Sequence, residues 1–152
     1  MSIQPQLAEI DIIILSNGPG EVATWVRPVV RALRDKLGID RDLVRISAIL
    51  SPDSNSGGGE IEALRSYPEI DRVQGAESFT QFLLWGKTRE NWDWRERGVV
   101  IFLGGDQIFP VIVGKRLGYQ TVVYAEWENL ITTEEDNHPS PSPIPIFPSL
   151  TP

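Results

Sequence analysis

Short apolar runs alternate along the chain with segments in which apolar residues recur every three or four positions. Short apolar runs are typical of buried β-strands, and the wider spacing is typical of one face of a helix. The pattern predicts strands at residues 10–15, 44–50, 71–74, 98–103 and 120–124, and helices at residues 22–37, 60–67, 76–84 and 108–117. Strand and helix therefore alternate through most of the chain.

This alternation predicts the class of fold. Three of the strands are apolar at consecutive positions, which indicates that both of their faces are covered. Strands that alternate with helices favour a parallel sheet with helices on its two faces. We therefore predict an α/β domain with a doubly wound, Rossmann-like parallel sheet. Gly38 and Gly118 are placed to end helices, and Pro28 predicts a kink or a restart within the first one.

Composition excludes several classes of site. The chain has 152 residues, enough for one domain, and a net charge of −7, which argues against a protein that binds nucleic acid by neutralising phosphates. Cysteine is absent and His138 is the one histidine, so thiolate chemistry, histidine metal clusters and a Ser-His-Asp triad are not expected. We predict no cofactor and no metal site. The chain has no run of about 18–20 apolar residues and no signal-peptide pattern, so we expect a cytoplasmic protein.

The charge changes towards the carboxyl terminus. From residue 125 onward there are five acidic residues and no lysine or arginine, and six of the twelve prolines lie in residues 139–152. Such a segment buries too little apolar surface to offset the entropy of ordering it. We therefore predict a flexible start at residues 1–9, a folded domain at residues 10–128 and a disordered tail at residues 129–152. The alternative for the tail is a ligand for a proline-recognition module.

The loops after the strands are the expected place for binding chemistry, because ligands of open α/β sheets lie beyond the carboxyl ends of the strands. The first is Ser16-Asn17-Gly18-Pro19-Gly20-Glu21, in which glycine permits positive φ and close approach of a ligand. It lacks the third glycine of a dinucleotide fingerprint and the lysine of a P-loop. It forms either a tight turn with Glu21 as the charge at the helix start, or a wall of a polar cleft.

Two later loops carry carboxylates. In Gly104-Gly105-Asp106-Gln107, Asp106 either caps the following helix or binds a sugar hydroxyl and acts as a base. After the last strand, Glu126-Trp127-Glu128 places an aromatic ring beside carboxylates, a combination that suits carbohydrate contact.

Two groups of cationic and aromatic residues have surface interpretations. Arg27, Arg31 and Arg34 share one helix face, which is either solvated or in contact with an acidic lipid surface. Trp92 and Trp94 lie among arginines and serve either local packing or contact with a membrane interface.

Two stretches carry a family resemblance. DIIILSNGPGEVATWVRPVVRALR and VVIFLGGDQIFPVIVGKRLGYQTVVYAEWE resemble the N-terminal half of glycosyltransferases related to lipid-A-disaccharide synthase, which have two Rossmann-like domains in the GT-B arrangement. The resemblance covers roughly residues 10–128. The family's usual Gly-Glu-x-Ser-Gly-Asp first loop is replaced here by Ser-Asn-Gly-Pro-Gly-Glu, which indicates a divergent branch.

The resemblance implies the acceptor-binding half of an enzyme that transfers a sugar from a nucleotide-sugar donor to a glycolipid or related acceptor, with peripheral contact at the inner face of a membrane. Asp106 is then the candidate base and Glu21 its alternative. The implied substrate-binding residues are Asn17, Gly18, Gly20, Gly104, Gly105, Gln107 and Glu126.

The resemblance also implies a second, donor-binding domain, for which residues 129–152 have no suitable pattern. We therefore expect a truncated chain that is inactive alone, unless a donor domain is supplied in trans. The alternatives are a small α/β module that binds a sugar or nucleotide without catalysis, and a non-functional remnant with an exposed apolar edge.

Overall fold

The computed structural model describes residues 8–38, 40–53, 57–104 and 107–124. The strands in these ranges are β1 (Ile10–Ser16), β2 (Val44–Leu50), β3 (Arg72–Gln74), β4 (Gly98–Phe102) and β5 (Gln120–Val123). The helices are α1 (Pro19–Glu21), η1 (Val22–Val26), α2 (Arg27–Leu37), α3 (Glu60–Ser66), η2 (Ala76–Ser78), α4 (Phe79–Trp85) and α5 (Ile108–Leu117). Each predicted strand and helix is present, with small shifts at its ends.

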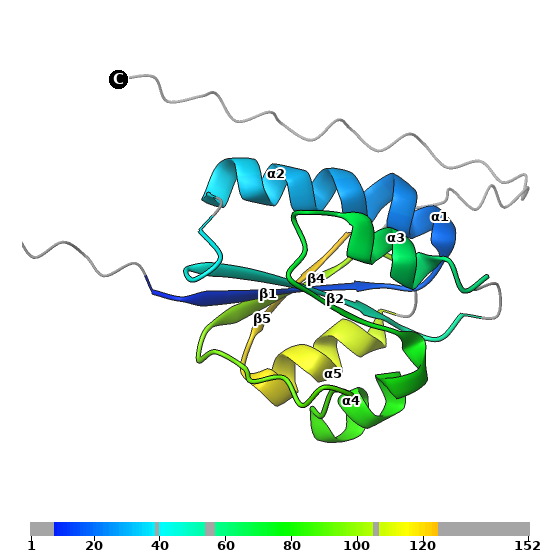
Figure 1. Cartoon of the computed structure of the whole chain (residues 1–152). Coiled ribbons are helices and arrows are strands. Elements are labelled where there is room, and N and C mark those ends of the chain that lie inside the picture. The colour runs from blue at the N-terminus through cyan, green and yellow to red at the C-terminus, as the bar shows by residue number, and fades with distance from the viewer. Residues whose placement is uncertain (1–7, 39, 54–56, 105–106, 125–152) are drawn as a thin grey trace, which may run out of the picture.

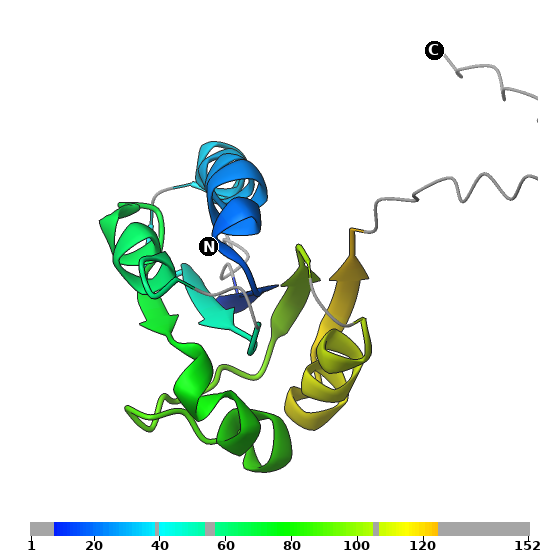
Figure 2. The same ribbon diagram turned by 90° about the vertical axis from the view of Figure 1, so that its right-hand side faces the viewer.

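The five strands form one sheet in the order β3-β2-β1-β4-β5, and each neighbouring pair is parallel. Figure 1 shows α2 and α3 on one face of the sheet and α4 and α5 on the other. The predicted doubly wound, Rossmann-like α/β fold is thereby confirmed. The view along the sheet in Figure 2 places β3 and β5 at its two edges.

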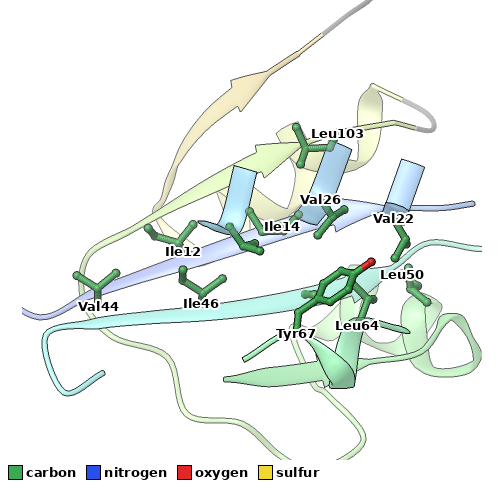
Figure 3. Close-up of a cluster of buried hydrophobic side chains, with 12 residues drawn as sticks. Ile12, Ile14, Val22, Val26, Val44, Ile46, Leu50, Leu64, Tyr67 and Leu103 are labelled. Carbon is green, nitrogen blue, oxygen red and sulfur yellow. The ribbon is translucent and has the colours of Figure 1, made fainter. Parts of the chain in front are cut away.

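The central strand β1 explains why the strands read as unbroken apolar runs. Its side chains alternate between two buried clusters, with Ile12 and Ile14 in one and Ile13 and Leu15 in the other. The first cluster lies between the sheet and the helices that contain Val22, Val26 and Leu64, as Figure 3 shows. A strand covered on both faces stabilises the fold through every apolar side chain that it carries.

The helix that follows β1 contains the predicted irregularity at Pro28. Between α1 and α2 lies η1, a π-helical turn in which the backbone N–H of Arg27 donates to the carbonyl of Val22, five residues earlier. Proline has no N–H to donate, so a change in the hydrogen-bond ladder beside it is expected. The helix then ends as predicted at Gly38, whose φ is +92°.

A buried carboxylate organises the amino ends of the strands. Asp11 in β1 is fully buried and accepts hydrogen bonds from Arg45 Nε at 2.7 Å, from the backbone N–H of Arg95 at 2.9 Å and from the Tyr119 hydroxyl at 3.1 Å. Burial alone would raise the pKa of Asp11, but the hydrogen bonds from Arg45 and from the Arg95 backbone, together with the charges of Arg45 and Arg72, hold it below its ordinary value of 3.8.

The segment between α4 and β4 covers this network. It contains Trp92 and Trp94, for which the structure confirms the prediction of local packing. The Arg72 guanidinium lies 4.6 Å from the ring centre of Trp92 and 5.1 Å from that of Trp94. Both tryptophans also pack against the cluster under α4 and α5. Cation–π contact and apolar packing therefore account for the position of both rings.

The prediction that Arg34 lies on a surface-exposed face of the first long helix is wrong. Its side chain is buried and donates to the carbonyls of Val44 and Glu69 and to the carboxylate of Asp71. Arg27 and Arg31 remain exposed. The helices in the described ranges are all too short or too polar to cross a membrane.

The Asp11 network predicts an acid-sensitive fold. We expect Asp11→Asn to lower the free energy of unfolding by about 3 kcal/mol at pH 7, because it leaves the largely covered guanidinium groups of Arg45 and Arg72 without their buried carboxylate. Since the pKa of Asp11 is lowered in the folded chain, its stabilising contribution is present above the unfolded pKa and is lost as pH falls through the folded pKa. The variant should therefore lose less stability than the parent below about pH 4.

Urea unfolding at several pH values measures both effects. Asp93→Asn is the matched control, because Asp93 also pairs with Arg45 but its side chain is 79% exposed. We expect it to change the free energy of unfolding by less than about 1 kcal/mol. Equal losses in the two variants at pH 7 would contradict a dominant role for Asp11.

Candidate functional site

The order of the strands locates a candidate site between β1 and β4. The chain passes from β1 outward to β2 and β3, returns to β4 on the other side of β1, and continues to β5. Ligands of open α/β sheets bind at such a reversal of strand order, beyond the carboxyl ends of the strands. The loops after β1 and β4 begin there side by side, because the N–H of Leu103 donates to the carbonyl of Leu15 at 2.9 Å.

Gly18 is the point at which the loop after β1 is most crowded. Its N–H donates to Asn17 Oδ1 at 2.9 Å. A Cβ at this position would lie 2.5 Å from Glu21 Oε2 and 3.1 Å from Asp53 Oδ2. The carboxylates of Glu21 and Asp53 therefore both approach Gly18, one from the end of α1 and one from the loop after β2.

Gly104 brings the loop after β4 to the same place. A Cβ at Gly104 would lie 2.7 Å from Glu21 Cγ and 3.4 Å from Asn17 Oδ1, and its φ of +130° is one that side-chain-bearing residues rarely adopt. Positive φ and close approach, which we predicted for the glycines of the loop after β1, thus occur together at Gly104 in the loop after β4. Gly18 has a φ of −104°, so close approach and not positive φ explains the glycine there.

A small cavity of about 130 Å³ opens at this junction. Its lining comprises Glu21, Trp25, Leu103, Gly104 and Tyr124. The rings of Trp25 and Tyr124 lie with their centres 5.1 Å apart and their planes tilted by 43°. The cavity therefore combines a carboxylate with a pair of aromatic rings.

Glu21 has no basic partner within the described part of the chain, where the salt bridges all involve other carboxylates. Such a carboxylate is available to accept a hydrogen bond from a ligand hydroxyl or to remove its proton. Ser16, at the end of β1, adds a buried hydroxyl that has no hydrogen-bond partner among these residues.

Glu60, the first residue of α3, is a buried carboxylate with a role different from that of Glu21. Its carboxylate accepts the N–H of Gly57 at 2.8 Å, and hydrogen bonds from its own N–H and from Gly57 and Gly58 lower its pKa despite its burial. It therefore stays ionised and stabilises the start of α3. Because backbone N–H groups of the chain satisfy this carboxylate, it is not evidence for a ligand. No group of three potential metal ligands occurs within the described ranges.

The structure brings together four of the predicted site residues: Asn17, Gly18, Glu21 and Gly104. Gly20 is exposed, with nothing within 4 Å of a Cβ placed there, so neither positive φ nor close approach explains it. Gln107 is also exposed, and it occupies the N-cap position of α5, which was one of the two roles that we considered for Asp106. Gly105, Asp106 and Glu126 lie outside the described residues.

Sequence reasoning missed the aromatic pair. The predicted elements placed Trp25 in a helix and Tyr124 at the end of a strand, and nothing in their spacing brings the two together. The signal was topological, because Tyr124 follows β5, next to β4 in the sheet, and Trp25 lies in the helix that follows β1.

Together, the strand order and the cavity define a Rossmann-like α/β domain with a polar and aromatic site at its switch point. The chain matches no protein-family model, no curated protein and no solved structure. The geometry of the site and the sequence resemblance are therefore the two supports for a functional proposal.

The crowding at Glu21 predicts how glycine substitutions behave. We expect Gly104→Ala to lower the free energy of unfolding by about 1–3 kcal/mol, because its backbone is strained for alanine and the new Cβ would collide with Glu21. Gly20→Ala is the control and should raise the free energy by about 0.4–1 kcal/mol, because its surroundings are open and alanine restricts the unfolded chain. Urea unfolding of the two variants decides the point. Similar effects of the two substitutions would contradict the packing of Glu21 against Gly104.

Proposed function

We propose that this chain is the acceptor-binding half of a glycosyltransferase related to lipid-A-disaccharide synthase. The observation that carries the proposal is the cavity at the switch point, where the carboxylate of Glu21 lies beside the rings of Trp25 and Tyr124. Aromatic rings pack against the apolar face of a sugar, and a carboxylate accepts hydrogen bonds from its hydroxyl groups.

The proposed chemistry is activation of an acceptor hydroxyl. A carboxylate that removes the hydroxyl proton makes the oxygen a better nucleophile towards the anomeric carbon of a nucleotide sugar. As the new bond forms, the bond from that carbon to the phosphate oxygen breaks, and the nucleotide leaves with its electron pair. Glu21 lies in the cavity, and Asp106, in the loop after β4, is the other candidate base. The donor has to be held across a cleft in the correct orientation, so transfer requires a second domain.

The surface of α5 and β5 supports a partner for this domain. Five large apolar side chains on these elements and just after them are exposed: Ile108, Val111, Val122, Val123 and Tyr124. β5 is also an edge strand, and a strand edge with apolar faces readily pairs with another chain. We propose that a donor-binding domain, supplied in trans, packs against this edge.

The proposed acceptor is a glycolipid, which implies peripheral contact with a membrane. Arg27 and Arg31 on the first long helix are exposed and suit an acidic lipid surface. Arg34 is excluded from such contact by its buried hydrogen bonds.

Binding of a glycolipid analogue tests the site. We expect octyl glucoside, kept below its micelle concentration, to shift the indole N–H signal of Trp25 in the NMR spectrum of the ¹⁵N-labelled chain. Glu21→Gln should weaken this binding about tenfold, because it removes a charged hydrogen-bond acceptor from the cavity.

Glu62→Gln is the control, since Glu62 is an exposed carboxylate on α3 outside the cavity. An unchanged affinity in Glu21→Gln, or an equal loss in both variants, would contradict acceptor binding at this site. Binding that is followed by transfer from a nucleotide sugar without any added domain would contradict the need for a partner.

The apolar edge makes a separate prediction about association. We expect the chain to self-associate as its concentration rises and Val122→Lys to remain monomeric, because a charge on an edge strand opposes pairing. Sedimentation velocity measures the effect. Leu84→Lys is the matched control: Leu84 is 49% exposed and Val122 52%, but Leu84 lies on α4. A monomeric parent chain, or an equal effect of Leu84→Lys, would refute the role of the β5 edge.

A further inference from the structure

A second, larger cavity lies at the opposite edge of the sheet, beside β3. Its volume is about 310 Å³. Its polar lining comes from the end of α3, from the end of β3 and the residues after it, and from the segment after α4. The lining includes Arg65, Gln74, Glu77, Arg89, Glu90 and Trp92. None of them lines the cavity at the switch point, and Figure 2 shows β3 and β5 at opposite edges of the sheet.

Gln74 is the feature that distinguishes this cavity from a surface depression. Its side chain is only 4% exposed. Its Oε1 accepts the backbone N–H of Arg89 at 2.9 Å, which fixes the amide so that Nε2 is the donor on the other side. Nε2 is buried and has no hydrogen-bond partner within the described residues. Buried donors are nearly always paired, so this amide calls for an acceptor atom that the described residues do not supply.

The charges around the Gln74 amide indicate which class of ligand would supply the missing acceptor atom. Arg65 and Arg89 bring two positive charges, and Glu77 and Glu90 bring two negative ones, so the formal charges of the lining cancel. Glu77 lies 3.4 Å from the Arg89 guanidinium, and Glu90 accepts the Trp92 indole N–H at 3.2 Å. A phosphate or carboxylate ligand would meet both carboxylates, which disfavours an anion.

A neutral ligand with many hydroxyl groups fits better. Each hydroxyl both donates and accepts, so it can accept from Gln74 Nε2 or a guanidinium and donate to a carboxylate. The Trp92 ring supplies an apolar wall, and Arg72 and Trp94 hold that ring in place. Hydrogen-bond donors and acceptors suit the hydroxyl groups of a sugar, and the indole suits the apolar face of its ring.

We propose that the cavity beside β3 is a binding site for a neutral hexopyranose, with Gln74 Nε2 donating to a ring substituent and Trp92 packing against the ring. It is separate from the switch-point site and does not depend on glycosyl transfer. A sugar bound in this cavity would lie at the β3 edge of the sheet, opposite the β5 edge.

NMR titration of the full ¹⁵N-labelled chain with glucose tests the proposal. We expect saturable shifts of the Gln74 side-chain amide and of the Trp92 indole N–H, while the Trp25 signal reports separately on the switch-point cavity. Gln74→Glu keeps the acceptor oxygen for Arg89 and removes the donor, and should weaken glucose binding about tenfold. Gln81→Glu, the same change at an exposed position of α4, should leave the affinity unchanged.

Three results would overturn the proposal: no saturable shift of Gln74 with glucose, an unchanged affinity in Gln74→Glu, or shifts with inorganic phosphate and not with glucose. The last result would identify an anion site. If Gln74→Glu does not fold, Glu90→Gln decides, because Glu90 is exposed and its replacement spares the core. A several-fold loss of affinity in that variant supports the site, and an unchanged affinity refutes it. If the Trp25 indole N–H does not shift with octyl glucoside while Gln74 shifts with glucose, the acceptor site is refuted and the site beside β3 is supported.

Discussion

The arrangement of the domain depends on the hydrogen bonds and ion pairs of one buried carboxylate. Asp11 lies at the amino end of the central strand, and its partners come from β2, from the segment before β4 and from the residue before β5. A buried carboxylate is tolerated only where several donors and positive charges compensate its lost hydration, as they do here. Because these contacts fix the amino ends of the strands relative to one another, they also fix the carboxyl ends, where the loops of the candidate site begin.

The two ends of β1 therefore have opposite electrostatic character. At the amino end, Asp11 is enclosed by guanidinium groups, and its charge is fully used in holding the fold. At the carboxyl end, Glu21 packs against two glycines and has no cation beside it within the described residues. A carboxylate without a cation among the described residues can accept a hydrogen bond from a ligand. This is the physical reason for our proposal that Glu21 acts in binding, whereas Asp11 stabilises the fold.

The fold was predictable because its signal is repeated along the chain, whereas the site was predictable only in part. Five apolar strands separated by helical patterns leave few alternatives to a parallel sheet. The glycines of the first loop indicated close approach, and Gly18 shows it, whereas the close approach at Gly104 was not predicted. The pairing of Trp25 with Tyr124 was not predictable, because 99 positions separate them and only the strand order joins their elements. Arg34 was misassigned for a similar reason, since its partners lie on β2 and before β3.

The two edges of the sheet differ in a way that bears on how the domain works. Beside β3 the lining of the cavity is mostly polar, and the Trp92 ring in it lies against the Arg72 guanidinium. Beside β5 the described surface is apolar, and Val122 and Tyr124 are about half exposed. Apolar surface of this extent stabilises a complex when it is covered and favours aggregation when it is not. The switch-point cavity includes Tyr124 in its lining, so a partner that packs on β5 would also complete the wall of the site. Association and ligand binding would then be coupled, because each would restrict the same aromatic side chain.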